Sequence, residues 1–193
     1  NSYQADGRTY LVTANEGDAR EWGSYIDEAR VKDLGKKGLA AVCSDSPLAA
    51  LKGDADLGRL KVATDLGVAA GADCYSELYS YGGRSFSIWT TDGQQVFDSG
   101  DGFERVLADA VPDYFNSGHD ETGFDTRSAS KGPEPESVAI GDVNGRTYAF
   151  VGLERVGGVI VYDITDPAAS AFVTYINNRD FSAGKAPSAA SLD

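Results

Sequence analysis

The sequence predicts an all-β fold with small helical insertions, a partial β-propeller of about two four-stranded antiparallel blades. The first observation is residues 131–176, which hold four short runs rich in Val, Ile, Phe, Tyr and Thr, with a turn signal at each break. The second is a repeat of part of this stretch near the start of the chain. A four-stranded meander of about 40–45 residues is the size of one propeller blade.

Residues 131–176 contain the complete blade. Its runs are PESVAIGDV, RTYAFVGLER, GVIVYDIT and AFVTYI. The breaks between them are turn pairs, namely Asn144-Gly145, Gly157-Gly158 and Asp166-Pro167. Alternating strands joined by such pairs predict antiparallel hairpins.

The other blade is split along the chain. Residues 6–16 match residues 144–154, with Gly-Arg-Thr-Tyr repeated in full and Glu16 aligned with Glu154. Residues 82–98 match the third and fourth runs of the complete blade, from its Gly-Gly pair onward. The second strand of the split blade is therefore expected at 8–16 and the next two at 83–98, and its first strand is expected before Asn1.

Two insertions interrupt the blades. Residues 17–81 form the longer one, with little core of its own, a short helix expected at 26–34 and a strand expected from Arg59. Residues 100–130 form the second, where helical spacing from Phe103 ends at Pro112. We assign residues 1–180 to the partial propeller and residues 181–193, rich in Ala, Ser, Gly and Pro, to a tail or linker.

The composition excludes several classes of partner. The net charge of −13 argues against nucleic acid or an anionic membrane, because neither would release counterions to such a surface. No apolar run approaches the roughly 20 residues that a membrane span needs. The first residues lack the basic and apolar regions of a signal peptide, so none is expected in this sequence. The sequence contains no Met, which predicts a processed or trimmed piece of a longer protein.

Cys43 and Cys74 are the only cysteines. Their spacing matches no zinc pattern, so the alternatives are one disulfide or two buried thiols. Both lie in a polar insertion, where a crosslink would stabilise most, and we favour the disulfide and an oxidising compartment. The predicted location is secreted, periplasmic or cell-surface.

Most of the chain resembles one protein family. The matching segments include ANEGDAREW at 14–22, ELYSYGGRSFSIW at 77–89, FDTRSASKGPEPESV at 124–138 and YAFVGLERVGGVIVYDITDP at 148–167. They resemble the choice-of-anchor I family, and they are similar to the animal mesenchyme-specific cell surface glycoproteins. The resemblance implies a secreted or surface-anchored β-propeller, often labelled alkaline phosphatase-like.

Acidic residues are the candidate metal ligands. Glu16 and Glu154 occupy equivalent strand ends, and Glu134 and Glu136 precede a first strand in a segment that two prolines are expected to hold extended. Carboxylates converging from several blades would suit Ca²⁺ or another divalent metal. The alternative is that each carboxylate is solvated or paired with an arginine, as in Glu154 with Arg127 or Arg155 with Glu136.

Arg84 and Arg155 are the candidate anion-binding residues, because a guanidinium binds phosphate with two parallel hydrogen bonds. His119 is the only histidine and the only catalytic candidate, as general base or metal ligand, with a solvent-exposed loop residue as the alternative. The aromatic residues Trp22 and Tyr25 are expected to pack inside the insertion.

Two functions are consistent with these residues. The first is a divalent-metal-dependent phosphoester hydrolase, with Glu16, Glu134, Glu136 and Glu154 as metal ligands. The alternative is a non-catalytic, calcium-stabilised surface, adhesion or partner-binding propeller module. The expected partners are the remainder of the propeller, in the same or another chain, and a phosphate ester or an extracellular partner.

Overall fold

The computed structural model describes residues 1–183, which divide into two compact units. The first unit consists of residues 1–16 together with the chain from residue 83 onward. The second unit is residues 17–82, which correspond to the longer predicted insertion. Of the tail expected at 181–193, residues Phe181–Ala183 form a 3₁₀ turn, η5, and residues 184–193 lie outside the described residues.

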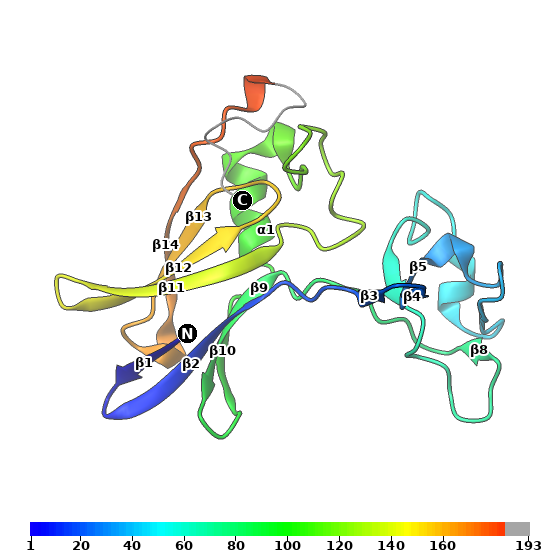
Figure 1. Ribbon diagram of the computed structural model, residues 1–193, viewed down its shortest axis with the longest axis horizontal. Helices are drawn as coiled ribbons and strands as arrows, with labels where there is room; N and C mark the ends of the chain where they lie inside the picture. The colour runs from blue at the N-terminus through cyan, green and yellow to red at the C-terminus, as the bar shows by residue number, and fades with distance from the viewer. Residues whose placement is uncertain (184–193) are drawn as a thin grey trace. The chain divides into compact units, whose positions relative to one another are not determined.

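The first unit contains two four-stranded antiparallel sheets, shown in Figure 1. The first sheet has the order β1-β2-β9-β10, with strands Ser2–Ala5, Arg8–Asn15, Ser85–Thr90 and Gln95–Asp98. The second has the order β11-β12-β13-β14, with strands Pro135–Val143, Arg146–Leu153, Val159–Asp163 and Ala171–Ile176. The predicted repeat is therefore present as two sheets of the same strand order.

Equivalent two-residue turns open the repeat in both sheets. Asp6 and Gly7 have φ of 48° and 72°, and Asn144 and Gly145 have 52° and 77°. Left-handed conformations at both central positions give the turn that matches the twist of paired strands. The expectation that the first strand precedes Asn1 was wrong, because β1 fills that position and pairs with β2.

The core of the first unit lies between the two sheets. Val12 and Phe86 of the first sheet and Tyr162 of the second are buried there. Helix α1, Gly102–Ala110, adds Phe103 and Leu107, which are one helical turn apart and fully buried. The predicted helix after residue 102 is thus confirmed, and its apolar face explains why it forms at this place.

The second unit is built from short strands and 3₁₀ turns. Its elements are β3 Glu21–Trp22, β4 Tyr25–Ile26, β5 Glu28–Arg30, η1 Val31–Asp33, β6 Ala41–Val42, η2 Pro47–Ala50, β7 Lys61–Ala63 and β8 Cys74–Tyr75. The helix expected at 26–34 is instead strand β5 followed by η1, because β5 pairs with β7. The expected strand after Arg59 is confirmed as β7.

This unit has a small core of its own. Val31, Leu34 and Val62 are fully buried in it. A disulfide joins Cys43 to Cys74, which confirms that prediction. The bond lies beside the parallel pair β6–β8, so it ties together two strands too short to hold alone.

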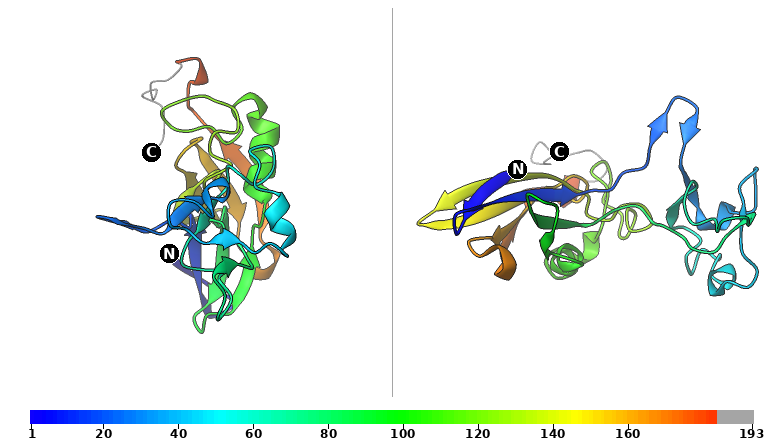
Figure 2. Two further views of the ribbon diagram at one scale, coloured as in Figure 1. Left: turned by 90° about the vertical axis from the view of Figure 1, so that its right-hand side faces the viewer. Right: turned by 90° about the horizontal axis from the view of Figure 1, so that it is seen from below.

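The aromatic residues of the second unit differ from the prediction. Trp22 is 72% exposed and Tyr25 is 45% exposed, so they do not pack inside the insertion. They face each other across the two-stranded hairpin β3–β4. Figure 2 shows this hairpin standing away from the other strands of its unit.

The described chain is therefore mostly β, with one α-helix and several sheets that do not close into a ring. The remaining described elements are the 3₁₀ turns η3 Pro112–Tyr114, η4 Pro167–Ala169 and η5 Phe181–Ala183. None of the helices between residues 1 and 183 has the length and apolarity that crossing a membrane requires. The partial propeller remains a prediction.

Candidate functional site

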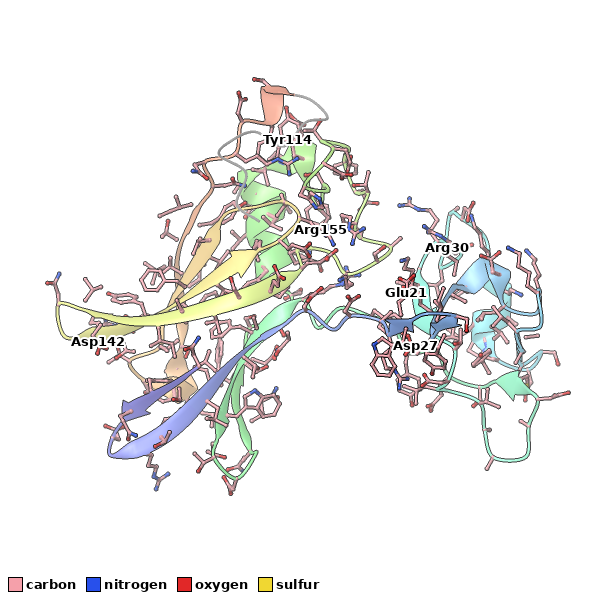
Figure 3. All side chains as sticks on the ribbon, viewed as in Figure 1. Glu21, Asp27, Arg30, Tyr114, Asp142 and Arg155 are labelled. Atoms are coloured by element: carbon pink, nitrogen blue, oxygen red, sulfur yellow. A yellow bond between two sulfur atoms is a disulfide. The ribbon has the colours of Figure 1, made fainter. Side chains whose placement is uncertain are left out.

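Two repeated strand ends bring Glu16 and Glu154 to one edge of the first unit. Glu16 directly follows β2 and Glu154 directly follows β12. The backbone fixes both positions, because Gly83 N–H donates to the Glu16 carbonyl at 3.2 Å and Glu154 N–H donates to the Glu134 carbonyl at 2.9 Å. Figure 3 labels Arg155, the next residue, at this edge, with Asp142 at the opposite end of the sheet.

Glu134 reaches the same place from the segment before β11. Its φ is 51°, a left-handed conformation that costs energy for a residue with a side chain. The expectation that the flanking prolines hold this residue extended was therefore wrong. The turn directs the carboxylate inward, where its side chain is fully buried.

The predicted metal ligands divide into two groups. Glu16, Glu134 and Glu154 have carboxylate oxygens within 4.8 Å of one another. Glu136 is exposed and does not belong to this group. Its separation follows from the left-handed residue at Glu134, because an extended segment would have sent both side chains to the same side.

Three cations neutralise the three carboxylates. Lys131 Nζ forms ion pairs with Glu16 and, at 3.1 Å, with Glu134. Arg127 pairs with Glu134, and its Nε donates to Oε1 at 2.9 Å. Arg155 donates to Glu134 Oε2 at 3.1 Å and pairs with Glu154 at 2.9 Å. We call these six residues the carboxylate network, with Glu134 at its centre.

The network shifts two acidities in opposite directions. Burial alone would raise the pKa of Glu134, but hydrogen bonds from Arg127, Lys131 and Arg155 outweigh it and hold that pKa at about 2. Burial, followed by the neighbouring Glu134 carboxylate, raises the pKa of Glu154 to about 7. Glu134 therefore stays ionised at neutral pH, while Glu154 binds a proton more readily than an ordinary glutamate does.

The anion-binding candidates are engaged within the protein. Arg84 donates to Glu104 Oε1 at 2.8 Å and to the Ser128 carbonyl at 2.7 Å, so it ties α1 to the loop before β11. Arg155 is held by the carboxylate network. A phosphate ester would have to replace these partners to bind either guanidinium.

His119 lies beside Arg155 and is half-buried, not a fully exposed loop residue. Arg155 Nη1 lies 2.6 Å from His119 Nδ1. A guanidinium can only donate, so Nδ1 accepts and the proton of the neutral ring sits on Nε2. In this state the ring has no free basic nitrogen with which to act as a general base.

Two residues that the sequence did not single out hold the site together. Lys131 bridges Glu16 and Glu134, as described above. Arg179 is buried, and its guanidinium donates to the Gly118 carbonyl at 2.7 Å and to the Glu121 carbonyl at 2.8 Å. The sequence indicated Arg179 only through its position in the segment YINNRDFS at 175–182, which resembles the choice-of-anchor I family.

The carboxylate oxygens of the network are the type of ligand that a divalent cation prefers, but they are too few and their charges are already paired. Ca²⁺ takes about six to eight oxygen ligands, and here three carboxylates converge. Each of the three is already bonded to a lysine or an arginine. As arranged, the carboxylates fit a lysine ammonium better than a calcium ion.

Comparison with known proteins identifies relatives of the chain. A model of the choice-of-anchor I domain matches residues 1–167. Gigasin-3a of Magallana gigas is 40% identical over 94 residues, which cover 46% of this chain and 33% of that protein. The mesenchyme-specific cell surface glycoprotein of Strongylocentrotus purpuratus is 28% identical over 195 residues, which cover 84% of this chain and 24% of that protein.

The chain thus spans a third or less of the length of these relatives. No solved structure matches it. The family match covers most of the chain, including both four-stranded sheets up to the turn after β13. The chain belongs to the choice-of-anchor I domain family.

Proposed function

We propose that the chain forms part of a surface-associated module that binds a partner and does not turn over a substrate. The name of the sea urchin relative, a cell surface glycoprotein, supports the surface location. The repeated pair of four-stranded sheets supports a propeller whose further blades belong to a longer protein. Surface or secreted location also agrees with the disulfide, which persists in oxidising compartments.

One observation carries the non-catalytic half of the proposal. The charged side chains that could hold a metal or a phosphate are bonded to one another, with Glu134 fully buried among three cations. A catalytic site needs groups that are free to meet the substrate, or that exchange partners when it arrives. In this module, the carboxylate network instead fixes the strand ends and the loop from which a binding surface is built.

The competing hypothesis is a divalent-metal-dependent phosphoester hydrolase. The convergence of Glu16, Glu134 and Glu154 favours it, because carboxylate oxygens are the ligands of hard cations. It requires the metal to displace Lys131 and requires Arg84 or Arg155 to leave an internal partner. Those exchanges make the hypothesis testable.

The two functions are separated by one pair of measurements. Thermal unfolding is followed in Ca²⁺ and in EDTA, and turnover of p-nitrophenyl phosphate is followed in Ca²⁺, Mg²⁺ and Mn²⁺. We expect no turnover. Metal-dependent turnover that Glu16→Gln abolishes and Glu136→Gln leaves intact would overturn the proposal, since only Glu16 belongs to the network. Stabilisation by Ca²⁺ without turnover would mean that the module binds a metal but is not catalytic.

A further inference from the structure

The second unit contains a concentration of positive charge in a chain that is otherwise acidic. Residues 28–37 and 52–61 hold seven lysines and arginines and four acids, although the whole chain has 17 basic and 30 acidic residues. Both segments belong to the second unit. The net charge of −13 therefore does not describe these two segments, which are positive together.

Strand pairing brings the two segments side by side. β5 pairs with β7, so that Arg30 lies directly opposite Lys61. The guanidinium of Arg30, which Figure 3 labels, donates to the Arg59 carbonyl at 2.8 Å. The backbone N–H of Lys32 donates to the Gly58 carbonyl at 3.1 Å. Like charges opposite one another destabilise a sheet, so the Arg30–Lys61 pair does not exist for the sake of stability.

One exposed carboxylate lies among three of these cations. Lys32 Nζ is 2.9 Å from Asp54 Oδ1, and the two side chains are 39% and 59% exposed. The hydrogen bond from Lys32 lowers the pKa of Asp54, and the charges of Arg59 and Arg30 lower it further. Three cations thus share one carboxylate, and the surface stays positive after this internal pairing.

The turn after η1 adds two exposed lysines, Lys36 and Lys37. The N–H of Lys36 donates to the Asp33 carbonyl at 3.0 Å, which places the turn against η1. The N–H of Leu39 donates to the Lys36 carbonyl at 2.9 Å and closes the turn. Within residues 1–183, neither ammonium group forms a hydrogen bond or an ion pair. We call Arg30, Lys32, Lys36, Lys37 and Arg59 the basic patch.

Lys37 is an unexpected residue at its position in this turn. Lys37 and the following glycine have φ of 51° and 84°, and such turns favour Asn, Asp or Gly at the first of these positions. The two hairpin turns of this kind have Asp6 and Asn144 there. Arg84 and Glu134 are also left-handed, but their side chains are bonded inside the protein. Lys37 has no such bond in the described part of the chain, and strained residues of this kind cluster at functional sites.

The basic patch suits a partner that is a narrow anionic chain. A polyanion that pairs with lysines and arginines releases its condensed counterions, which drives binding. Charges farther apart than about 10 Å are largely screened in about 0.1 M salt, so such a partner responds to the patch and not to the net charge. A flexible chain can lie on a small patch, whereas a flat membrane must also approach the acids around it.

The compartment narrows the choice of polyanion. The disulfide Cys43–Cys74 lies in the same unit and indicates an oxidising environment. The anionic chains displayed at cell surfaces are polysaccharides that carry sulfate esters and carboxylates. We infer that the basic patch binds a sulfated polysaccharide, whose sulfate groups contact Lys36, Lys37 and the cations around Asp54. This inference rests on the proposed function, because it names the class of partner of a surface module.

Heparin serves as the probe, and its binding to the full chain is measured by calorimetry over a series of salt concentrations. The double variant Lys36→Ala/Lys37→Asn removes two exposed charges from the patch. Each lost contact should lower the slope of log affinity against log salt by about 0.7, so we expect the affinity to fall about tenfold in about 0.15 M salt. Arg8→Ala/Arg105→Ala is the matched control, since it removes the same charge from exposed positions of the first unit and should leave the affinity nearly unchanged.

A single substitution separates binding from folding. Lys37→Asn places at the turn the residue that Asn144 provides in the second sheet, so it should relieve strain. We expect heparin affinity to fall about fourfold in about 0.15 M salt. Protection of the Leu39 amide against exchange should not fall, because the bond that closes the turn is kept. An affinity equal to that of the unchanged chain would overturn the inference.

Three further results would overturn it. The first is no binding of heparin by the unchanged chain. The second is an equal loss of affinity in the two double variants, which would show a response to net charge alone. The third is equally tight binding of a single-stranded oligonucleotide of matched length and charge, because the patch would then not be specific for a polysaccharide. Turnover of p-nitrophenyl phosphate bears on the proposed function and leaves the heparin result unchanged.

Discussion

Replacing Glu134 with Gln should be the most damaging single change of charge in the first unit. Its side chain is fully buried, while those of Arg127, Lys131 and Arg155 are 28%, 10% and 22% exposed. Breaking a buried ion pair by removing one partner costs about 3–5 kcal/mol. Because the cations retain some water and two other carboxylates, we expect a loss of about 3 kcal/mol in the free energy of unfolding.

The assay must follow the first unit alone. The two tryptophans are Trp22 in the second unit and Trp89 in the first. Trp22 is 72% exposed, so Trp22→Phe should cost little and leave Trp89 as the single fluorescent reporter. Urea unfolding is then measured for Glu134→Gln in this background. Glu136→Gln is the matched control, since Glu136 is an exposed glutamate two residues further along the chain, in β11.

The pH dependence provides the sign of the effect. The pKa of Glu134 is about 2 in the folded chain and 4.5 ordinarily, so its stabilisation is complete above pH 4.5. It is lost as the pH falls from about 4.5 to about 2, and the gap between wild type and Glu134→Gln should close over that range. The reasoning is refuted if Glu134→Gln and the control differ by less than about 0.5 kcal/mol at pH 7.

Three other outcomes follow from the same structure. Glu154→Gln should stabilise the chain more at pH 8 than at pH 4.5, because the raised pKa of about 7 means that ionised Glu154 is disfavoured in the folded state. Equal changes in the free energy of unfolding at both pH values, measured by urea titration, would contradict this. Reduction of Cys43–Cys74, which closes a 31-residue separation, should cost the second unit about 3–4 kcal/mol, measured by its amide-exchange protection with and without reductant. Arg179→Lys should lower the protection of the loop from Gly118 to Glu121 against amide exchange, because an ammonium cannot reproduce the hydrogen bonds of the guanidinium to several carbonyls. Unchanged amide exchange in this loop would show that its structure does not depend on Arg179.

The sheets were predictable because the signals for them are local. The pairs Asp6-Gly7 and Asn144-Gly145 demand left-handed turns, and the repeated Gly-Arg-Thr-Tyr that follows each pair marks the same strand twice. Strand β1 was missed because it has four residues, of which only Tyr3 is buried. So short an edge strand shows no alternation, and its pairing with β2 depends on the turn rather than on its own pattern.

The second unit was harder to predict because its structure depends on contacts between distant residues. Residues 26–34 have the spacing of a helix, but β5 is held by its pairing with β7 some thirty residues later. Local propensity loses to such tertiary pairing in short segments. The disulfide was predictable for a different reason: two cysteines leave only one possible bond.

The sequence predicted the glutamates of the carboxylate network but not the ion pairs that they form. The repeat brought Glu16 and Glu154 to equivalent strand ends, and the structure places them together. The suggested pairs, Glu154 with Arg127 and Arg155 with Glu136, both miss Glu134, the acid that binds Arg127 and Arg155 in the structure. The reason is the left-handed turn at Glu134. A non-glycine residue between two prolines is expected to be extended, so the sequence does not predict this turn.

That turn also explains why the network forms at all. A strained residue persists only where surrounding contacts overdetermine it. Glu134 is bonded to Arg127 and Lys131 from the loop before β11 and to Arg155 from the segment after β12. Removing the carboxylate should therefore release the backbone as well as the charges. Amide exchange at the segment before β11 should rise in Glu134→Gln but not in Glu16→Gln, which leaves the other bonds of Glu134 in place. Equal exchange in the two variants would mean that the prolines, and not the ion pairs, hold the turn.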